Sequence, residues 1–143
     1  MKAEKTTILD FVPEEKQARV SKIDEPRSST HVIALVPVEY LNHTWPDVRE
    51  EIERAVLRAN GRWSIEALYA SILNGEQQLW IAFDEDKNIE GVGTTEVAYY
   101  PAKTMMVIQF LGGNNFNSWV WDMLEKFKQF GRDHGCQGIE ATG

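Results

Sequence analysis

Residues 104–142 read TMMVIQFLGGNNFNSWVWDMLEKFKQFGRDHGCQGIEAT, and this stretch decides the fold. Residues 104–111 are rich in β-branched, aromatic and long apolar side chains, which is typical of a buried strand. After Gly112 and Gly113, apolar side chains from Val120 to Phe130 recur at helical spacing. Gly135 ends that helix, and residues 137–142 form a last strand. A strand, a helix and a strand in this order predict two parallel strands.

Upstream of this unit, the sequence predicts two more strands at 78–83 (QLWIAF) and 89–100 (IEGVGTTEVAYY). A charged turn at 84–88 and a short Pro101-Ala102-Lys103 turn separate the three apolar runs. Turns this short join antiparallel neighbours, so we expect a three-stranded antiparallel meander. Gly91 and Gly93 inside the second strand predict a bulge or a close backbone approach.

Two helices and one further strand complete the predicted domain. Residues 31–38 form an apolar first strand, and a helix follows from a capping Thr44 and an early Pro46 to Ala59. Ser64 caps a second helix that ends at Asn74-Gly75. The predicted fold is therefore a mixed α/β domain with the order strand, helix, helix, meander, helix, strand.

Residues 1–30 show neither helical nor strand periodicity, so we interpret them as an extended or flexible N-terminal arm. A segment that buries so little apolar surface does not offset its own ordering entropy. Another protein chain is the simplest means of ordering the arm. Its one apolar cluster provides the expected anchor, formed by Ile8, Leu9, Phe11 and Val12. The single domain is expected at residues 31–143.

Composition excludes several classes of function. The 143 residues carry a net charge of −7, and the excess acid lies beyond residue 30, so direct nucleic-acid binding is not expected. No apolar run is long enough to span a bilayer, and the first residues lack the pattern of a secretory signal, so we expect a cytoplasmic protein. One cysteine and three scattered histidines offer no metal-ligand spacing.

The order of elements from residue 31 to residue 143 resembles that of GNAT N-acetyltransferases. The run LEKFKQFGRDHGCQGIEATG at 124–143 is similar to the helix-to-strand stretch of that family, where a helix ends at a Gly-Cys pair. The run NGRWSIEALYASILNGEQQLWIAF at 60–83, with the later Gly-Gly, resembles short GNAT-like proteins encoded by tailed bacteriophages.

This resemblance implies an acetyl-CoA site after the fourth strand. In the family, a loop of the form Arg/Gln-x-x-Gly-x-Gly/Ala binds the cofactor's diphosphate through backbone amides at a helix start. The loop GGNNFNSW keeps two glycines but lacks the leading Arg or Gln and the spaced second glycine pair. Gly112, Gly113, Asn117 and Ser118 are the candidate cofactor-binding residues. Alternatively, the glycines only end a strand, and Asn117 or Ser118 only caps the helix.

A second departure from the family concerns its later elements. In GNAT enzymes the fifth strand is followed by a helix and strands that often carry a tyrosine acting as general acid, whereas this sequence stops at Gly143. Glu96 is the candidate catalytic base, and Glu140 is a weaker one. The last strand, 137–142, is expected to lie at an open sheet edge, where a partner strand is able to pair.

Two functions remain open from the sequence. The altered loop, the early stop and the arm favour a non-catalytic GNAT-fold binding or assembly module. A bacteriophage virion or virion-associated structural protein docked through its arm is one example. The alternative is an acetyl-CoA-dependent N-acetyltransferase acting on an unidentified amine.

Overall fold

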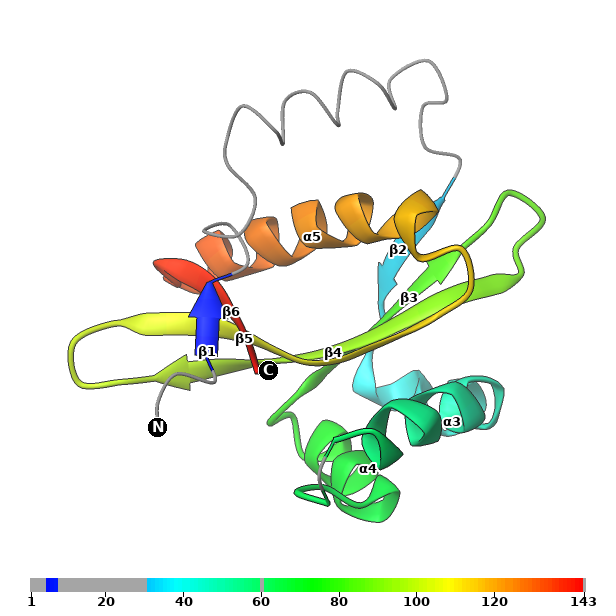
Figure 1. The fold of residues 1–143 in the computed structure, drawn as a ribbon, viewed down its shortest axis with the longest axis horizontal. Coiled ribbons are helices and arrows are strands. Elements are labelled where there is room, and N and C mark those ends of the chain that lie inside the picture. Colours follow the sequence, from blue (N-terminus) through cyan, green and yellow to red (C-terminus); the bar gives the residue numbers. More distant parts are fainter. Residues whose placement is uncertain (1–4, 8–30, 60, 143) are drawn as a thin grey trace.

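The computed structural model describes residues 5–7, 31–59 and 61–142, which form one six-stranded sheet flanked by helices (Figure 1). The elements along the chain are β1 (Lys5–Thr7), β2 (Val32–Leu35), a 3-10 turn η2 (Val38–Tyr40), α3 (Leu41–Leu57), α4 (Ile65–Leu73), β3 (Gln78–Phe83), β4 (Ile89–Tyr99), β5 (Thr104–Gly113), α5 (Phe116–Asp133) and β6 (Gly138–Thr142). The strand order across the sheet is β1-β6-β5-β4-β3-β2.

The strand pairing confirms the predicted mixed α/β fold. β2 to β5 are antiparallel neighbours, and β5 and β6 are parallel, as a strand-helix-strand unit requires. Ser64 caps α4 as expected, since its hydroxyl accepts a hydrogen bond from the Ala67 amide at 3.0 Å. Within the residues that the structure describes, no helix has the length and apolarity needed to cross a membrane.

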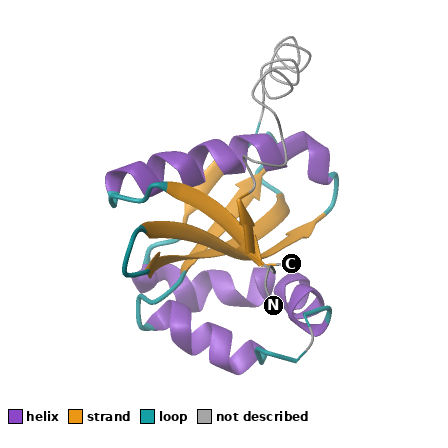
Figure 2. Ribbon diagram, turned by 60° about the vertical axis from the view of Figure 1, so that its left-hand side comes forward, coloured by secondary structure: helices purple, strands orange, loops and turns teal. Residues whose placement is uncertain are grey.

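Helices cover both faces of the sheet (Figure 2). α3 and α4 pack on one face over an apolar cluster that includes Leu79, Ile81 and Phe110. α5 packs on the opposite face over a cluster that includes Trp80, Met106 and Phe127. Alternate residues of β3 supply the two clusters, because successive side chains of a strand point to opposite faces.

The start of the first helix differs from the prediction. α3 begins at Leu41, directly after the turn η2, so Thr44 is a helix residue and not the cap. Pro46 consequently lies inside the helix. Leu41 is only 1% exposed, and burying it in the core extends the helix beyond the local capping signal.

The last strand is not a sheet edge, which corrects the expectation for residues 137–142. β1 pairs antiparallel with β6 from Lys5↔Thr142 to Thr7↔Glu140, so this chain's own N-terminal residues satisfy that ladder. The outermost strands are β1 and β2. The proposed anchor residues Ile8, Leu9, Phe11 and Val12 lie outside the described residues.

Gly91 is the close backbone approach that the sequence predicted. A Cβ placed on it would lie 2.3 Å from Cε2 of Trp119, which is fully buried. The adjacent Glu90 is the extra residue in a bulge, since Ala82 pairs with Gly91 while Phe83 pairs with Ile89. The indole of Trp119 thus rests on bare backbone beside a bulge.

We expect Gly91→Ala to lower the free energy of unfolding by about 1–3 kcal/mol, because the added methyl overpacks the core against the Trp119 indole. Urea unfolding followed by tryptophan fluorescence measures the change. Gly131→Ala is the matched control. Its Cβ would meet Cys136 Cβ at 3.4 Å, an ordinary contact, and alanine favours the helix. Equal stability of Gly91→Ala and wild type would contradict the packing argument.

Candidate active site

The parallel pairing of β5 and β6 ends before β5 does. The ladder runs from Met105↔Gly138 to Ile108↔Ala141, whereas β5 continues to Gly113. Backbone amides of a strand point alternately to its two sides. Between Gln109 and Gly113, every second amide therefore points away from β4, toward a side where the ladder with β6 has ended.

A bulge in β5 places Gln109 beside Glu96. Thr94 pairs with Phe110 and Thr95 with Ile108, so Gln109 is the extra residue. Its amide Nε2 donates a hydrogen bond of 2.7 Å to Oε1 of Glu96 on β4. Both side chains are partly buried, and the second carboxylate oxygen of Glu96 has no part in this bond. Gln109 directly follows Ile108, the last residue of β5 that pairs with β6, whereas Glu96 lies opposite Val107, which is still paired with β6.

Gly112 and Gly113 lie in the sheet and not in a loop. They pair with Val92 and Gly91 of β4, so the loop starts two residues later than predicted. A Cβ on Gly113 would lie 2.2 Å from the Glu90 carbonyl oxygen, and its φ of 139° favours glycine. Gly113 needs to be glycine because neighbouring backbone comes too close for a side chain, whereas the atom nearest to a Cβ on Gly112 would be a side-chain oxygen of Glu51.

Asn117 and Ser118 occupy the first turn of α5, so neither is the cap that the alternative interpretation expected. The cap is Asn115, in the left-handed conformation with φ 53°, and its side chain makes no capping bond. The Ser118 hydroxyl donates to the Asn115 carbonyl at 2.6 Å. The chain must reverse sharply between β5 and α5, and Asn tolerates this conformation better than most residues.

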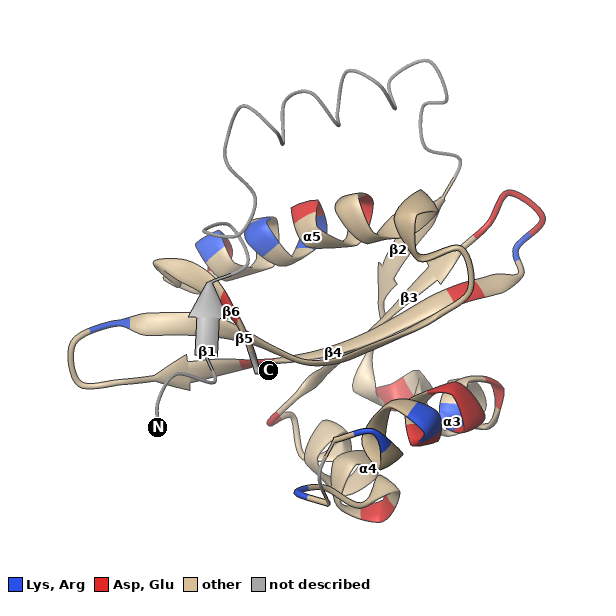
Figure 3. Cartoon of the chain, in the orientation of Figure 1, with Lys and Arg blue, Asp and Glu red and all other residues tan. Residues whose placement is uncertain are grey.

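The same first turn lines an open hollow of about 630 Å³, and four of its nine lining residues are acidic. Its lining comprises His31, Asp84, Glu85, Asp86, Glu90, Asn115, Phe116, Asn117 and Ser118. Figure 3 shows the acidic turn between β3 and β4 that forms one wall. Carboxylates on this side repel a diphosphate, so Asn117 and Ser118 are poorly placed to bind one there.

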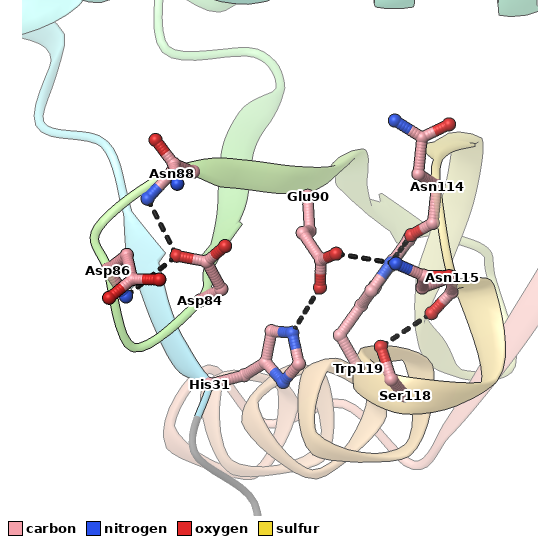
Figure 4. Close-up of polar contacts among 9 residues, drawn as sticks. All are labelled: His31, Asp84, Asp86, Asn88, Glu90, Asn114, Asn115, Ser118 and Trp119. Carbon is pink, nitrogen blue, oxygen red and sulfur yellow. Dashed lines mark hydrogen bonds and ion pairs between the residues drawn. The ribbon is translucent and has the colours of Figure 1, made fainter.

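Glu90 connects three elements at this hollow (Figure 4). Its carboxylate contacts His31 Nε2 at 2.6 Å and accepts a hydrogen bond from Asn115 Nδ2 at 2.7 Å. The hydrogen bonds with His31 and then Asn115 lower the pKa of the Glu90 carboxyl. The Trp119 indole N–H donates to the Asn114 carbonyl at 2.8 Å, which holds the start of α5 against β4.

Gln109 is a residue beside the predicted base Glu96 that the sequence interpretation did not consider. Residues 109–114 read Gln-Phe-Leu-Gly-Gly-Asn, which places Gln109 three residues before Gly112. The leading Gln of the family loop is therefore present, and only its last position departs, with Asn114 in place of Gly or Ala. The interpretation failed because it began the loop at Gly112, whereas the bulge lies within the strand.

The remaining candidates lie elsewhere. Glu140 is on β6, where it accepts a hydrogen bond of 3.3 Å from the Tyr100 hydroxyl. Cys136 is half-buried, and burial raises the pKa of its thiol, which leaves less of the reactive thiolate. In the described ranges, no three His, Cys, Asp or Glu side chains gather in a group that could hold a metal ion.

Comparisons with known proteins show the fold. No family model matches the sequence, and no curated protein matches it. The aminoglycoside N-acetyltransferase AAC(6')-Iy, solved with CoA, superposes with a TM-score of 0.59 at 14% identity, over 82% of this chain and 80% of that one. The aminoglycoside acetyltransferase meta-AAC0020 from a soil metagenome superposes with a TM-score of 0.57 at 17% identity, over 80% of this chain and 78% of that one.

A GNAT family acetyltransferase from Staphylococcus aureus gives a TM-score of 0.58 at 10% identity, covering 80% of this chain and 87% of that one. The chain therefore has a GNAT-like fold. At these identities the likeness extends to the fold and not to the activity. These neighbours do not link the chain to a bacteriophage, and the virion role stays a prediction.

We expect the Glu90 contacts to make stability depend on pH. Because the folded-state pKa is lowered, the stabilisation is present above the unfolded value near 4.5 and is lost as pH falls through the folded value. Wild type should thus lose its advantage over Glu90→Gln as pH falls from about 5 to about 3 in urea unfolding. Glu85→Gln, in the same hollow, should follow wild type. If the free energy of unfolding changed with pH in the same way for wild type and Glu90→Gln, this account would be contradicted.

Proposed function

We propose that this protein binds acetyl-CoA along the open edge of β5 and transfers the acetyl group to an amine. One observation supports this most strongly. β5 continues past its ladder with β6 as a bulged strand, and that bulge brings Gln109 against the carboxylate of Glu96. An open strand edge and a carboxylate able to accept a proton thus meet in one place.

The residues present fit the cofactor. The backbone amides between Gln109 and Gly113 that point away from β4 are able to donate hydrogen bonds to an extended, amide-containing chain. They would bond to it as they would to a paired strand. Gly112 has no side chain to keep a phosphate from the backbone. The Gln-x-x-Gly order at 109–112 matches the start of the family loop. Gly112, Gly113 and Gln109 are accordingly the proposed binding residues, whereas Asn117 and Ser118 face the acidic hollow.

Glu96 is the proposed general base. Acetyl-CoA would supply an activated thioester, whose carbonyl carbon would accept the amine nitrogen while CoA leaves as a thiolate and takes up a proton to give the free thiol. The attacking amine must lose a proton, and a carboxylate is a suitable acceptor. The bond from Gln109 holds one oxygen of Glu96, so the other oxygen is oriented to receive that proton. Gln109 acts here as a positioning residue.

A non-catalytic binding module is the second candidate, and the acidic hollow at the start of α5 favours it. GNAT-type binding of a diphosphate uses the amides of this helix start, and here Asp84, Glu85, Asp86 and Glu90 line the same turn. Their charge opposes an anion. In this case the arm residues would bind another protein chain, in a virion or elsewhere, and acetyl-CoA would have no effect on the domain.

A thermal melt with millimolar acetyl-CoA separates the two candidates, because a ligand that binds only the folded state raises the melting temperature. Transfer is then measured as free CoA thiol released with a panel of amines. We expect Glu96→Gln to keep the thermal shift but to lose about 100-fold or more in rate. Glu140→Gln is the control and should retain the rate. Absence of both a shift and thiol release would leave the binding module.

A further inference from the structure

Glu51 of α3 lies against the glycine end of β5. Its Oε2 atom is 3.1 Å from the point where a Cβ of Gly112 would be, and its backbone oxygen is 3.7 Å from that point. The side chain is only 22% exposed. A carboxylate therefore occupies the space above Gly112 on the face that α3 covers.

The other oxygen of this carboxylate pairs with an arginine. Oε1 of Glu51 accepts a hydrogen bond from Nη2 of Arg54 at 2.5 Å, and Nη1 of Arg54 contacts Glu50 at 3.4 Å. One carboxylate thus bridges the bare backbone of Gly112 and a guanidinium. A negatively charged group between a glycine backbone and an arginine is the arrangement that a bound phosphate would adopt.

We propose that Arg54 is a phosphate-binding residue of the acetyl-CoA site and that Glu51 is an internal competitor for the same position. This inference rests on the proposed function, because it assigns the cofactor's diphosphate to the Gly112 end of β5. When a phosphate enters, it takes the guanidinium from Glu51, and the Glu51 side chain moves away from Gly112.

The energetics permit this exchange. Arg54 is 53% exposed, and exposed ion pairs contribute little to stability, so separating it from Glu51 costs little. A guanidinium binds a phosphate through two parallel hydrogen bonds, which is a stronger arrangement than its single bond to Glu51. Glu51 therefore lowers the affinity for the cofactor without blocking the site.

The same helix offers a matched control pair. Arg49 Nη1 contacts Glu53 Oε1 at 3.2 Å, with side-chain exposures of 47% and 39%. Arg49 lines a different depression, between α3 and α4, with Trp45 and Tyr69. Substitutions of Arg49 and Glu53 therefore change the net charge of α3 by the same amount as substitutions of Arg54 and Glu51, without touching Gly112.

The test is the dissociation constant of CoA and of inorganic pyrophosphate, measured by calorimetry at constant salt on folded protein. Glu51→Gln should bind both ligands about fivefold more tightly, because a competing charge is removed. Arg54→Gln should bind both about tenfold more weakly, because a charged hydrogen-bond donor is lost. Glu53→Gln and Arg49→Gln should each stay within about twofold of wild type.

The outcomes separate the inference from the proposed function. CoA binding by wild type with equal effects of Glu51→Gln and Glu53→Gln would overturn the competitor role of Glu51. Unchanged affinity in Arg54→Gln would overturn its phosphate role, and in both cases the acetyl-CoA site itself would stand. No binding of either ligand by wild type or by Glu51→Gln would overturn the proposed function and this inference together.

Discussion

The contact between Trp119 and the bare backbone of Gly91 is the constraint on which the site depends. The indole is fully buried, and its N–H is bonded to the Asn114 carbonyl, so a single side chain fixes the end of β5 and the start of α5 against β4. These contacts lie on either side of Asn115, where the chain turns from β5 into α5. The acidic hollow at the start of α5 and the two glycines at the end of β5 lie on either side of this turn.

Two β-bulges place the polar side chains of the candidate site. Glu90 and Gln109 are each the extra residue where a ladder shifts register, and each side chain bonds to a second element. A bulge turns a side chain out of the regular alternation of a strand. Glu90 thereby reaches the start of α5, while Gln109 reaches across to Glu96. Regular strands would keep these side chains in their alternating rows.

The sequence predicted the elements well where periodicity and caps agree. The switch from helical to alternating spacing after Asn74-Gly75 located the meander, and Ser64 marked the start of α4. It failed where tertiary contacts override local signals. Burial of Leu41 moved the start of α3, and three residues of a segment without strand periodicity became β1 because β6 offered an open ladder.

The site was predictable only in part. Glu96 and the two glycines were predicted from their strand and turn positions, and they stay predictions, while Gln109 was readable from its spacing before Gly112. Asn117 and Ser118 line the acidic hollow and do not lie beside Gly112 and Gln109. This placement depends on the direction of the turn at Asn115, and no sequence motif predicts that direction. Glu51 and Arg54 look like an ordinary surface pair, and only the packing of α3 over Gly112 distinguishes them.

The pairing of β1 with β6 also orders the events of folding. It joins Lys5 to Thr142, which are almost as far apart in sequence as the chain allows, so closing this ladder carries a larger entropic cost than any hairpin in the sheet. The hairpins of the meander join strands that follow one another in the sequence, so they need only local contacts. During synthesis, β1 leaves the ribosome before the other strands of this sheet, and its neighbour β6 leaves after them.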